Sequence, residues 1–212
     1  MNYKFLYILI YFLINRYLWS APGDLNPNFG TYGSISVANE LISSCTVQPD
    51  DKIVSVGTLN SNVDKIVVSR FTANGSVDTS FNSSGSYIFN TPTVTQAGGI
   101  TLQTDNKILV CGSALQTQND FFVARLTTAG TLDTTFNTTG FNTTSIGSGA
   151  QANAIKTQST GDIIVGGTSI FGSPRFTLAR YTTAGALDAT FGTAGIARTN
   201  IAINDVLEDI AI

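Results

Sequence analysis

Histidine is absent from this chain of 212 residues, and only 12 % of its residues are charged. Without histidine the chain has no Ser/His/Asp triad, lacks the commonest general base and cannot form a metal site that uses imidazole. The eleven Lys and Arg residues are scattered and the net charge is −3. Nucleic-acid binding requires a basic stripe, so we expect no nucleic-acid partner.

Cysteine is also scarce, with only Cys45 and Cys111 present. Both occupy positions that are aliphatic in other copies of the repeat described below, because Cys45 aligns with Ile100 and Cys111 with Val56. We therefore predict two buried free thiols. The alternative is a disulfide, which an oxidising compartment would allow.

The only long apolar run lies near the amino terminus, where FLYILIYFLI fills positions 5–14. A short segment with one lysine precedes it, and Ser20 and Ala21 follow it. This order predicts a secretory signal peptide at residues 1–20, because ten residues are too few to cross about 30 Å of hydrocarbon. An uncleaved amino-terminal anchor and a buried helix are the alternatives. We expect a secreted or cell-surface protein that touches a membrane only through this segment, if it is uncleaved.

A repeat of about 55 residues fills the rest of the chain, residues 21–212. Its first landmark is an L-D-x-x-F motif with glycine four positions after the phenylalanine; the copies are Leu25–Phe29, Val77–Phe81, Leu132–Phe136 and Leu187–Phe191. The second is a turn followed by an apolar run, at Asp50–Val54, Asp105–Leu109 and Thr160–Ile164. The third is an apolar run that ends in Arg70, Arg125 and Arg180. Landmarks in one order at one period indicate a repeat array, with units at about 24–78, 79–133, 134–188 and a partial unit at 189–212.

Each unit has the pattern of about four short strands. In the second copy we predict strands at Gly98–Gln103, Lys107–Cys111, Asp120–Leu126 and Phe141–Ser145, separated by turn residues. Four antiparallel strands in a unit of this length form a β-propeller blade. A single blade cannot bury both faces, so neighbouring blades stack. We expect the recurring phenylalanine to fill the space between blades.

The motifs D-x-K-I-x-V-x-G, A-R and L-D-x-T-F together resemble the delta-60 repeat, a β-propeller-like family, from Asp24 to the carboxyl terminus. The third copy departs from the pattern at Thr160-Gly161-Asp162, and the first has Asn26 in place of aspartate. The resemblance implies an all-β, β-propeller-like fold. It implies no reaction.

About three and a half units are present, whereas a closed ring typically has about four to eight blades. Three explanations fit an incomplete ring. The reading frame continues past Ile212, the segment Asp205–Ile212 completes the first blade in an open or strained arc, or two chains pair. An open arc leaves unpaired edges, through which the protein could self-associate.

The charged residues that recur in the array are expected to be structural. An arginine precedes an aspartate by eight residues in the pairs Arg70/Asp78, Arg125/Asp133 and Arg180/Asp188. One pair per unit favours a repeated ion pair, and a ring that binds ions is the alternative. Paired carboxylates could hydrolyse glycosides, but the candidates Asp50, Asp51, Asp105 and Asp162 all lie at predicted turns.

The sequence therefore assigns no catalytic, cofactor-binding or metal-ligating residue. We predict an exported or surface repeat protein, not an enzyme, that acts as a structural or interaction module. Its partner would be an unknown protein or glycan. The alternative is a propeller enzyme or lectin-like module that acts on glycans through the turn carboxylates.

Overall fold

The structure is a computed structural model and describes residues 24–60, 65–90, 94–199 and 205–212. In these residues, strands form three antiparallel sheets of four strands each, and every sheet follows chain order. Sheet 1 contains β1 (Glu40–Val47), β2 (Ile53–Leu59), β3 (Lys65–Phe71) and β4 (Ser86–Ile88). Sheet 2 contains β5 (Val94–Leu102), β6 (Ile108–Leu115), β7 (Asn119–Leu126) and β8 (Phe141–Thr144). Sheet 3 contains β9 (Ala150–Thr157), β10 (Ile163–Phe171), β11 (Ser173–Tyr181) and β12 (Ile196–Thr199).

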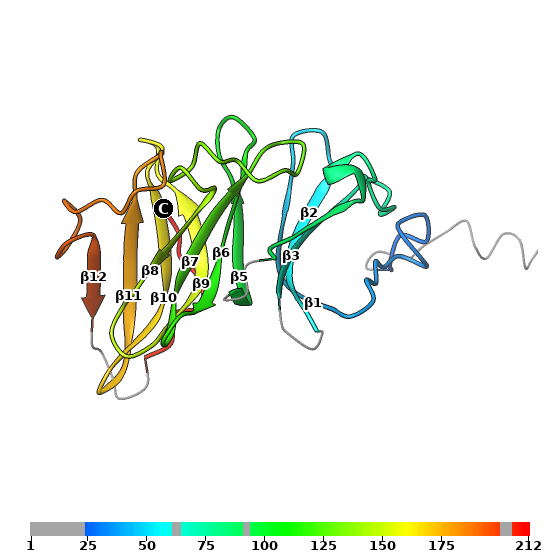
Figure 1. The fold of residues 1–212 in the computed structure, drawn as a ribbon. Coiled ribbons are helices and arrows are strands. Elements are labelled where there is room, and N and C mark those ends of the chain that lie inside the picture. The colour runs from blue at the N-terminus through cyan, green and yellow to red at the C-terminus, as the bar shows by residue number, and fades with distance from the viewer. Residues whose placement is uncertain (1–23, 61–64, 91–93, 200–204) are drawn as a thin grey trace, which may run out of the picture.

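The three sheets stand in a row as successive blades (Figure 1). The first strand of each later blade packs on the blade before it. Strand β5 contacts β1, β2 and β3, and β9 contacts β5, β6 and β7 in the same way. The prediction of an all-β array of four-stranded blades in an incomplete propeller is confirmed, because the described residues form three such blades and no closed ring.

The boundaries of the sheets differ from the boundaries of the repeat units predicted from the sequence. Those units end near the L-D-x-x-F motif, whereas each sheet runs from its first strand to its outermost strand. The motif at Leu132–Phe136 therefore lies between the third and fourth strands of its sheet. The reason is that the motif is a turn inside a blade, and the connection between blades carries no comparably regular pattern.

Two hydrophobic cores lie between the blades. The side chains of β6 alternate between them: Ile108 and Val110 pack in the core shared with sheet 1, whereas Leu109 and Cys111 pack in the core shared with sheet 3. Side chains on successive residues of a strand point to opposite faces of the sheet. A middle strand is thus buried on both faces, which explains its continuous apolar sequence.

The two cysteines lie in different environments. Both are free, so the disulfide alternative is not formed, and Cys111 is buried as predicted. The prediction of a buried thiol is wrong for Cys45, which is exposed on β1. Its repeat equivalents Ile100 and Ile155 are buried because a preceding blade covers them. No blade precedes sheet 1 in the described part of the chain.

We therefore expect one thiol to react with Ellman's reagent in the native protein and the second only after denaturation. Burial raises the pKa of the Cys111 thiol to about 12, although the Gly99 amide donates a hydrogen bond to the sulfur. The thiolate is the reactive form. Native reaction of both thiols at one rate, or of neither, would contradict this prediction.

The segment Asp205–Ile212 packs on sheet 3. The Leu207 amide donates to Thr168 Oγ1 at 3.4 Å, and Asn153 Nδ2 donates to the Leu207 carbonyl at 2.7 Å. The idea that this segment completes the first blade is therefore wrong. In the described residues, no helix is long and apolar enough to span a membrane. The predicted signal segment, residues 1–20, lies outside them.

Candidate functional site

The recurring arginine and aspartate form an ion pair in every blade, as predicted. In sheet 2, Arg125 Nε donates to Asp133 Oδ2 at 2.8 Å, and both side chains are almost fully buried. The other oxygen, Asp133 Oδ1, accepts bonds from the backbone amide and the hydroxyl of Thr135. The corresponding distances are 2.8 Å for Arg70–Asp78 and 2.7 Å for Arg180–Asp188. The pair closes a turn within its own blade.

The same arginine also bonds to the next blade. Arg125 Nη1 donates to the carbonyl of Thr183 at 2.8 Å, and the guanidinium lies 4.9 Å from the centre of the Phe136 ring. That ring packs against Gly185, where a β-carbon would lie 2.7 Å from a ring carbon. Gly185 has a φ of +87°, so glycine is needed there both for space and for backbone conformation.

We call this set of contacts the blade junction: the arginine, the phenylalanine and the residue after it, against the turn of the next unit. Between sheets 2 and 3, the junction also includes a bond from the Asn137 amide to the Ala184 carbonyl at 2.7 Å. Between sheets 1 and 2 it is repeated by Arg70 with Thr128, Phe81 with Gly130, and Asn82 with Ala129. The expectation that the recurring phenylalanine fills the space between blades is confirmed for Phe81 and Phe136, which are fully buried, but not for Phe29 and Phe191, which are partly exposed.

A related contact precedes sheet 1. The Gly30 amide, which follows Phe29, donates to the Asn74 carbonyl at 2.7 Å. Asn74 is the equivalent of Ala129 in the preceding repeat, and Gly30 is the equivalent of Asn82. The segment around Leu25–Phe29 thus sits on the turn of sheet 1 as each blade sits on the turn of the next.

Burial raises the pKa of Asp133, but the bonds from Thr135 and Lys107 and the charge of Arg125 outweigh burial and lower it to about 2. The Lys107 ammonium lies 3.2 Å from Asp133 Oδ2 and 3.6 Å from Asp105 Oδ2. The lysine of D-x-K therefore joins the turn carboxylate to the ion pair. Sequence reasoning missed this link, because the two positions meet only once the sheet has formed.

We expect the stability of the protein to fall as the pH drops from about 4 to about 2. An unfolded aspartate has a pKa of about 3.9, so in this window the unfolded chain binds a proton that folded Asp133 excludes, and protonation favours unfolding. Urea unfolding between pH 5 and pH 2 measures the effect. Asp133→Asn should show a shallower pH dependence than the natural chain, and identical slopes would contradict the assignment.

The turn carboxylates lie apart, one set per blade. Asp50 pairs with Lys52 at 3.0 Å, and Asp105 pairs with Lys107. In sheet 3, Asp162 replaces the lysine and accepts a bond from the Thr160 hydroxyl. The described residues contain no group of three or more metal-ligating side chains.

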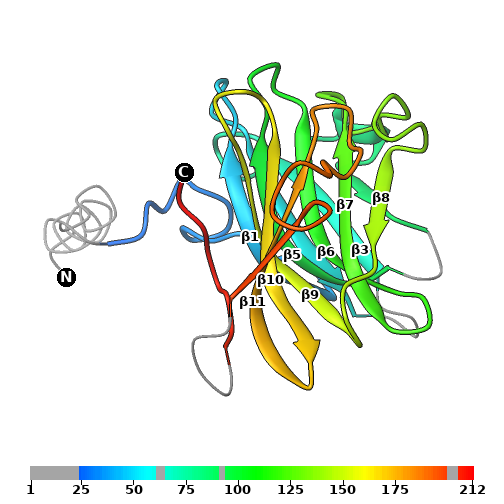
Figure 2. The ribbon, with the colours of Figure 1, turned by 90° about the vertical axis from the view of Figure 1, so that its left-hand side faces the viewer.

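One polar pocket is shared by all the units. We call it the channel pocket, a cavity of about 260 Å³ lined by Ser43–Thr46 of β1, Gly99–Thr101 of β5, Asn153–Lys156 of β9, and Glu208 and Asp209. Figure 2 looks along the row of sheets and shows the red carboxyl-terminal segment running on the side of the first strands, away from β8. Sequence reasoning missed the pocket, because its polar residues follow no repeated motif.

Comparison with known families agrees with this architecture. Residues 48–81, 103–136 and 158–191 match a family model described as "Domain of unknown function (DUF5122) beta-propeller". The chain carries β-propeller repeats. Each matched segment begins just after a first strand and ends on the phenylalanine of a blade junction, or, at residue 191, on its equivalent in sheet 3. The propeller repeats are therefore similar to that family over the turn, the two middle strands and the junction motif.

The crystal structure of a protein of unknown function from Bacteroides caccae is similar to the structure of this chain, with a TM-score of 0.40 and 11 % sequence identity. The match covers 77 % of this chain and 73 % of that one. No curated protein matches the chain.

Proposed function

We propose that this protein is an exported, non-enzymatic module of delta-60-type propeller repeats that binds a partner at the channel pocket. The observation that carries the proposal is a difference between two sets of polar residues, those that recur in every unit and those that line the channel pocket. The charged residues that recur in every unit are engaged in turns and blade junctions. The channel pocket instead collects polar residues that differ from blade to blade, which is what a specific binding surface requires.

The lining of the channel pocket suits a polar partner. Its lining residues include Ser43, Ser44 and Thr46 of β1, Asn153, Lys156, Glu208 and Asp209, which carry hydroxyl, amide, ammonium and carboxylate groups. Such groups recognise hydroxyl, amide or ammonium groups through directed hydrogen bonds. A protein loop or a glycan would satisfy this chemistry.

The exposed thiol in the pocket provides a test. A fluorophore attached to Cys45 can be titrated with extracellular proteins and with an array of glycans. We expect a partner to change its emission, and Glu208→Gln to weaken that partner by roughly tenfold, the value of one charged hydrogen bond. The matched control is Asp51→Asn, which removes a charge from an exposed turn and copies the residue of the next repeat, Asn106. Equal affinity of both variants would contradict the proposal.

A second candidate is action on glycans. It is favoured by the presence of two carboxylates, Glu208 and Asp209, in one pocket with Asn153. Incubation of the protein with the glycans that it binds distinguishes the candidates. Hydrolysis that Glu208→Gln abolishes would support an enzyme, whereas binding without turnover would support the interaction module.

Export has its own test. We expect secreted protein to begin near Ala21, because the apolar run at 5–14 and the small residues after it form a signal peptide. Mass spectrometry of protein from the medium measures the first residue. Secreted material that retains residues 1–20 would contradict cleavage, and retention in the cytoplasm would contradict export.

A further inference from the structure

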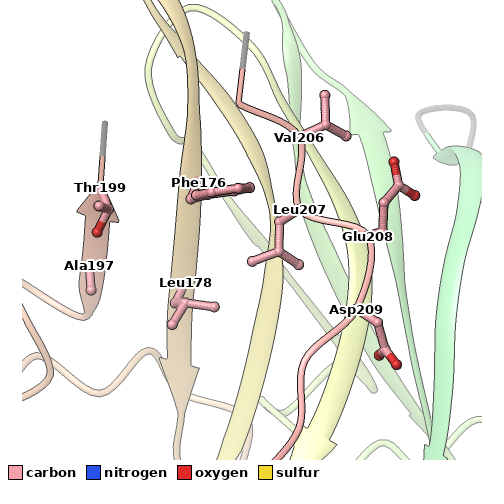
Figure 3. Close-up of a pocket in the computed structure, with 8 residues that line it drawn as sticks. All are labelled: Phe176, Leu178, Ala197, Thr199, Val206, Leu207, Glu208 and Asp209. Atoms are coloured by element: carbon pink, nitrogen blue, oxygen red, sulfur yellow. The ribbon is translucent and has the colours of Figure 1, made fainter. Parts of the chain in front are cut away.

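The outer face of sheet 3 is apolar and, in the described residues, only partly covered. Phe176 and Leu178 of β11 line a cavity of about 510 Å³ with Ala197 of β12 and Leu207. Figure 3 shows the side chains of Phe176, Leu178 and Leu207 at the rim of this hollow. We call this surface the trailing face.

The same strand positions are blade interfaces in the other two sheets. One repeat earlier, Phe121 and Val123 of β7 are fully buried in the core shared with sheet 3. Two repeats earlier, Ile66 and Val68 of β3 are fully buried in the core shared with sheet 2. In sheets 1 and 2, the face equivalent to the trailing face packs against the following blade. The trailing face is therefore a third surface of the same kind, and the described residues contain no following blade for it.

Half of a blade junction also lies on sheet 3. Among the described residues, Arg180 donates to Asp188 and Thr190 of its own unit, whereas Arg70 and Arg125 each reach a carbonyl of the following unit as well. The Phe191 ring is partly exposed, although it lies 4.9 Å from the Arg180 guanidinium just as Phe136 lies from Arg125. The Arg180 guanidinium and the Phe191 ring are therefore positioned to contact a turn that the described residues do not contain.

The first strand of a further unit already occupies its position. Asp205–Ile212 is equivalent to β9 one repeat earlier. The Leu207 amide donates to Thr168 Oγ1, and the Ala97 amide of β5 donates to Thr58 Oγ1 over the same sequence separation. Leu207 and Ile210 lie against Gly166 of β10. In the described residues the segment belongs to none of the three sheets.

We infer that the trailing face is the docking surface for a fourth propeller repeat unit, in which Asp205–Ile212 is the first strand and the second strand pairs with it. Its turn carbonyl would accept the bond from Arg180, and its turn glycine would cover Phe191. A second copy of the chain would bring its own first strand, β1, to a position that Asp205–Ile212 already fills. A unit that uses Asp205–Ile212 as its first strand would leave this segment in its present position.

The test adds a second, third and fourth strand to the full chain after Ile212. Because Ile212 is equivalent to Thr157, a copy of residues 158–199 is fused directly after Ile212. We expect the amides of residues 206–211 to exchange with deuterium at least roughly tenfold more slowly in the extended protein, since they gain strand partners. We also expect Phe191→Ala to lower the urea midpoint strongly in the extended protein and only slightly in the natural chain.

A matched control changes the appended equivalent of Gly185 to valine. It should abolish the added protection, because a side chain there would collide with Phe191. The inference is overturned if the appended residues misfold or leave residues 206–211 unprotected. It is also overturned if sedimentation shows the natural chain to be a dimer that Phe176→Asp dissociates, because the trailing face would then bind a second copy.

Discussion

Replacing Phe136 with alanine should lower the free energy of unfolding by about 3–5 kcal/mol, the usual cost of removing a buried aromatic ring. The ring is fully buried and packs against Gly185 of the next blade. It also lies beneath the Arg125 guanidinium. Its loss would leave a cavity between sheets 2 and 3 that the rigid turn of the next unit cannot fill.

The chain supplies its own control for this prediction. Phe191 has the same place in the motif and the same contact with an arginine, but in the part of the chain that the structure describes no following blade covers its ring. We expect Phe191→Ala to cost about 1 kcal/mol or less, because little apolar surface returns to water. Urea unfolding followed by circular dichroism measures both variants. Equal losses would show that the ring acts within its own turn and not between blades.

Replacing Asp133 with alanine should cost about 3–5 kcal/mol as well, because it leaves a buried arginine without its counter-charge. Arg125 would keep its bond to Thr183 but lose the carboxylate that faces Nε. The turn would lose the acceptor for the amide and hydroxyl of Thr135. Binding at the channel pocket should be unchanged in the fraction of the protein that remains folded.

The comparison for this variant is Asp188→Ala. The Arg180–Asp188 pair is more accessible, with side-chain exposures of 24 % and 15 % against 8 % and 6 % for Arg125–Asp133. Water can solvate a more accessible arginine, so the loss of stability should be clearly smaller than for Asp133→Ala. Loss of partner binding by Asp133→Ala at unchanged stability would mean that the aspartate serves recognition and not the fold.

The features that the sequence predicted well are those that recur in phase. Four strands per unit, the filling role of Phe81 and Phe136, and the ion pairs all follow from residues that keep one spacing in successive copies. A residue that recurs in every unit meets the same neighbours within its own unit, so the alignment of copies is a reliable guide to those contacts.

The exceptions are residues whose neighbours depend on their place in the array. Cys45 aligns with buried Ile100 and Ile155, yet it is exposed because its surroundings depend on the blade before it. The channel pocket was not predictable for a related reason. Asn153, Lys156 and Glu208 have no common motif and meet only when the first strands of successive units pack together.

The blade junction gives the array a direction. Each motif contacts the turn of the unit that follows it, so the two ends of the array are chemically different. The turn of sheet 1 is capped through the Gly30–Asn74 bond, whereas in the described residues no turn of a following unit covers the arginine and the phenylalanine of sheet 3. An array joined in this way can gain a unit by internal duplication without any new interface, because each added copy brings both halves of the next contact.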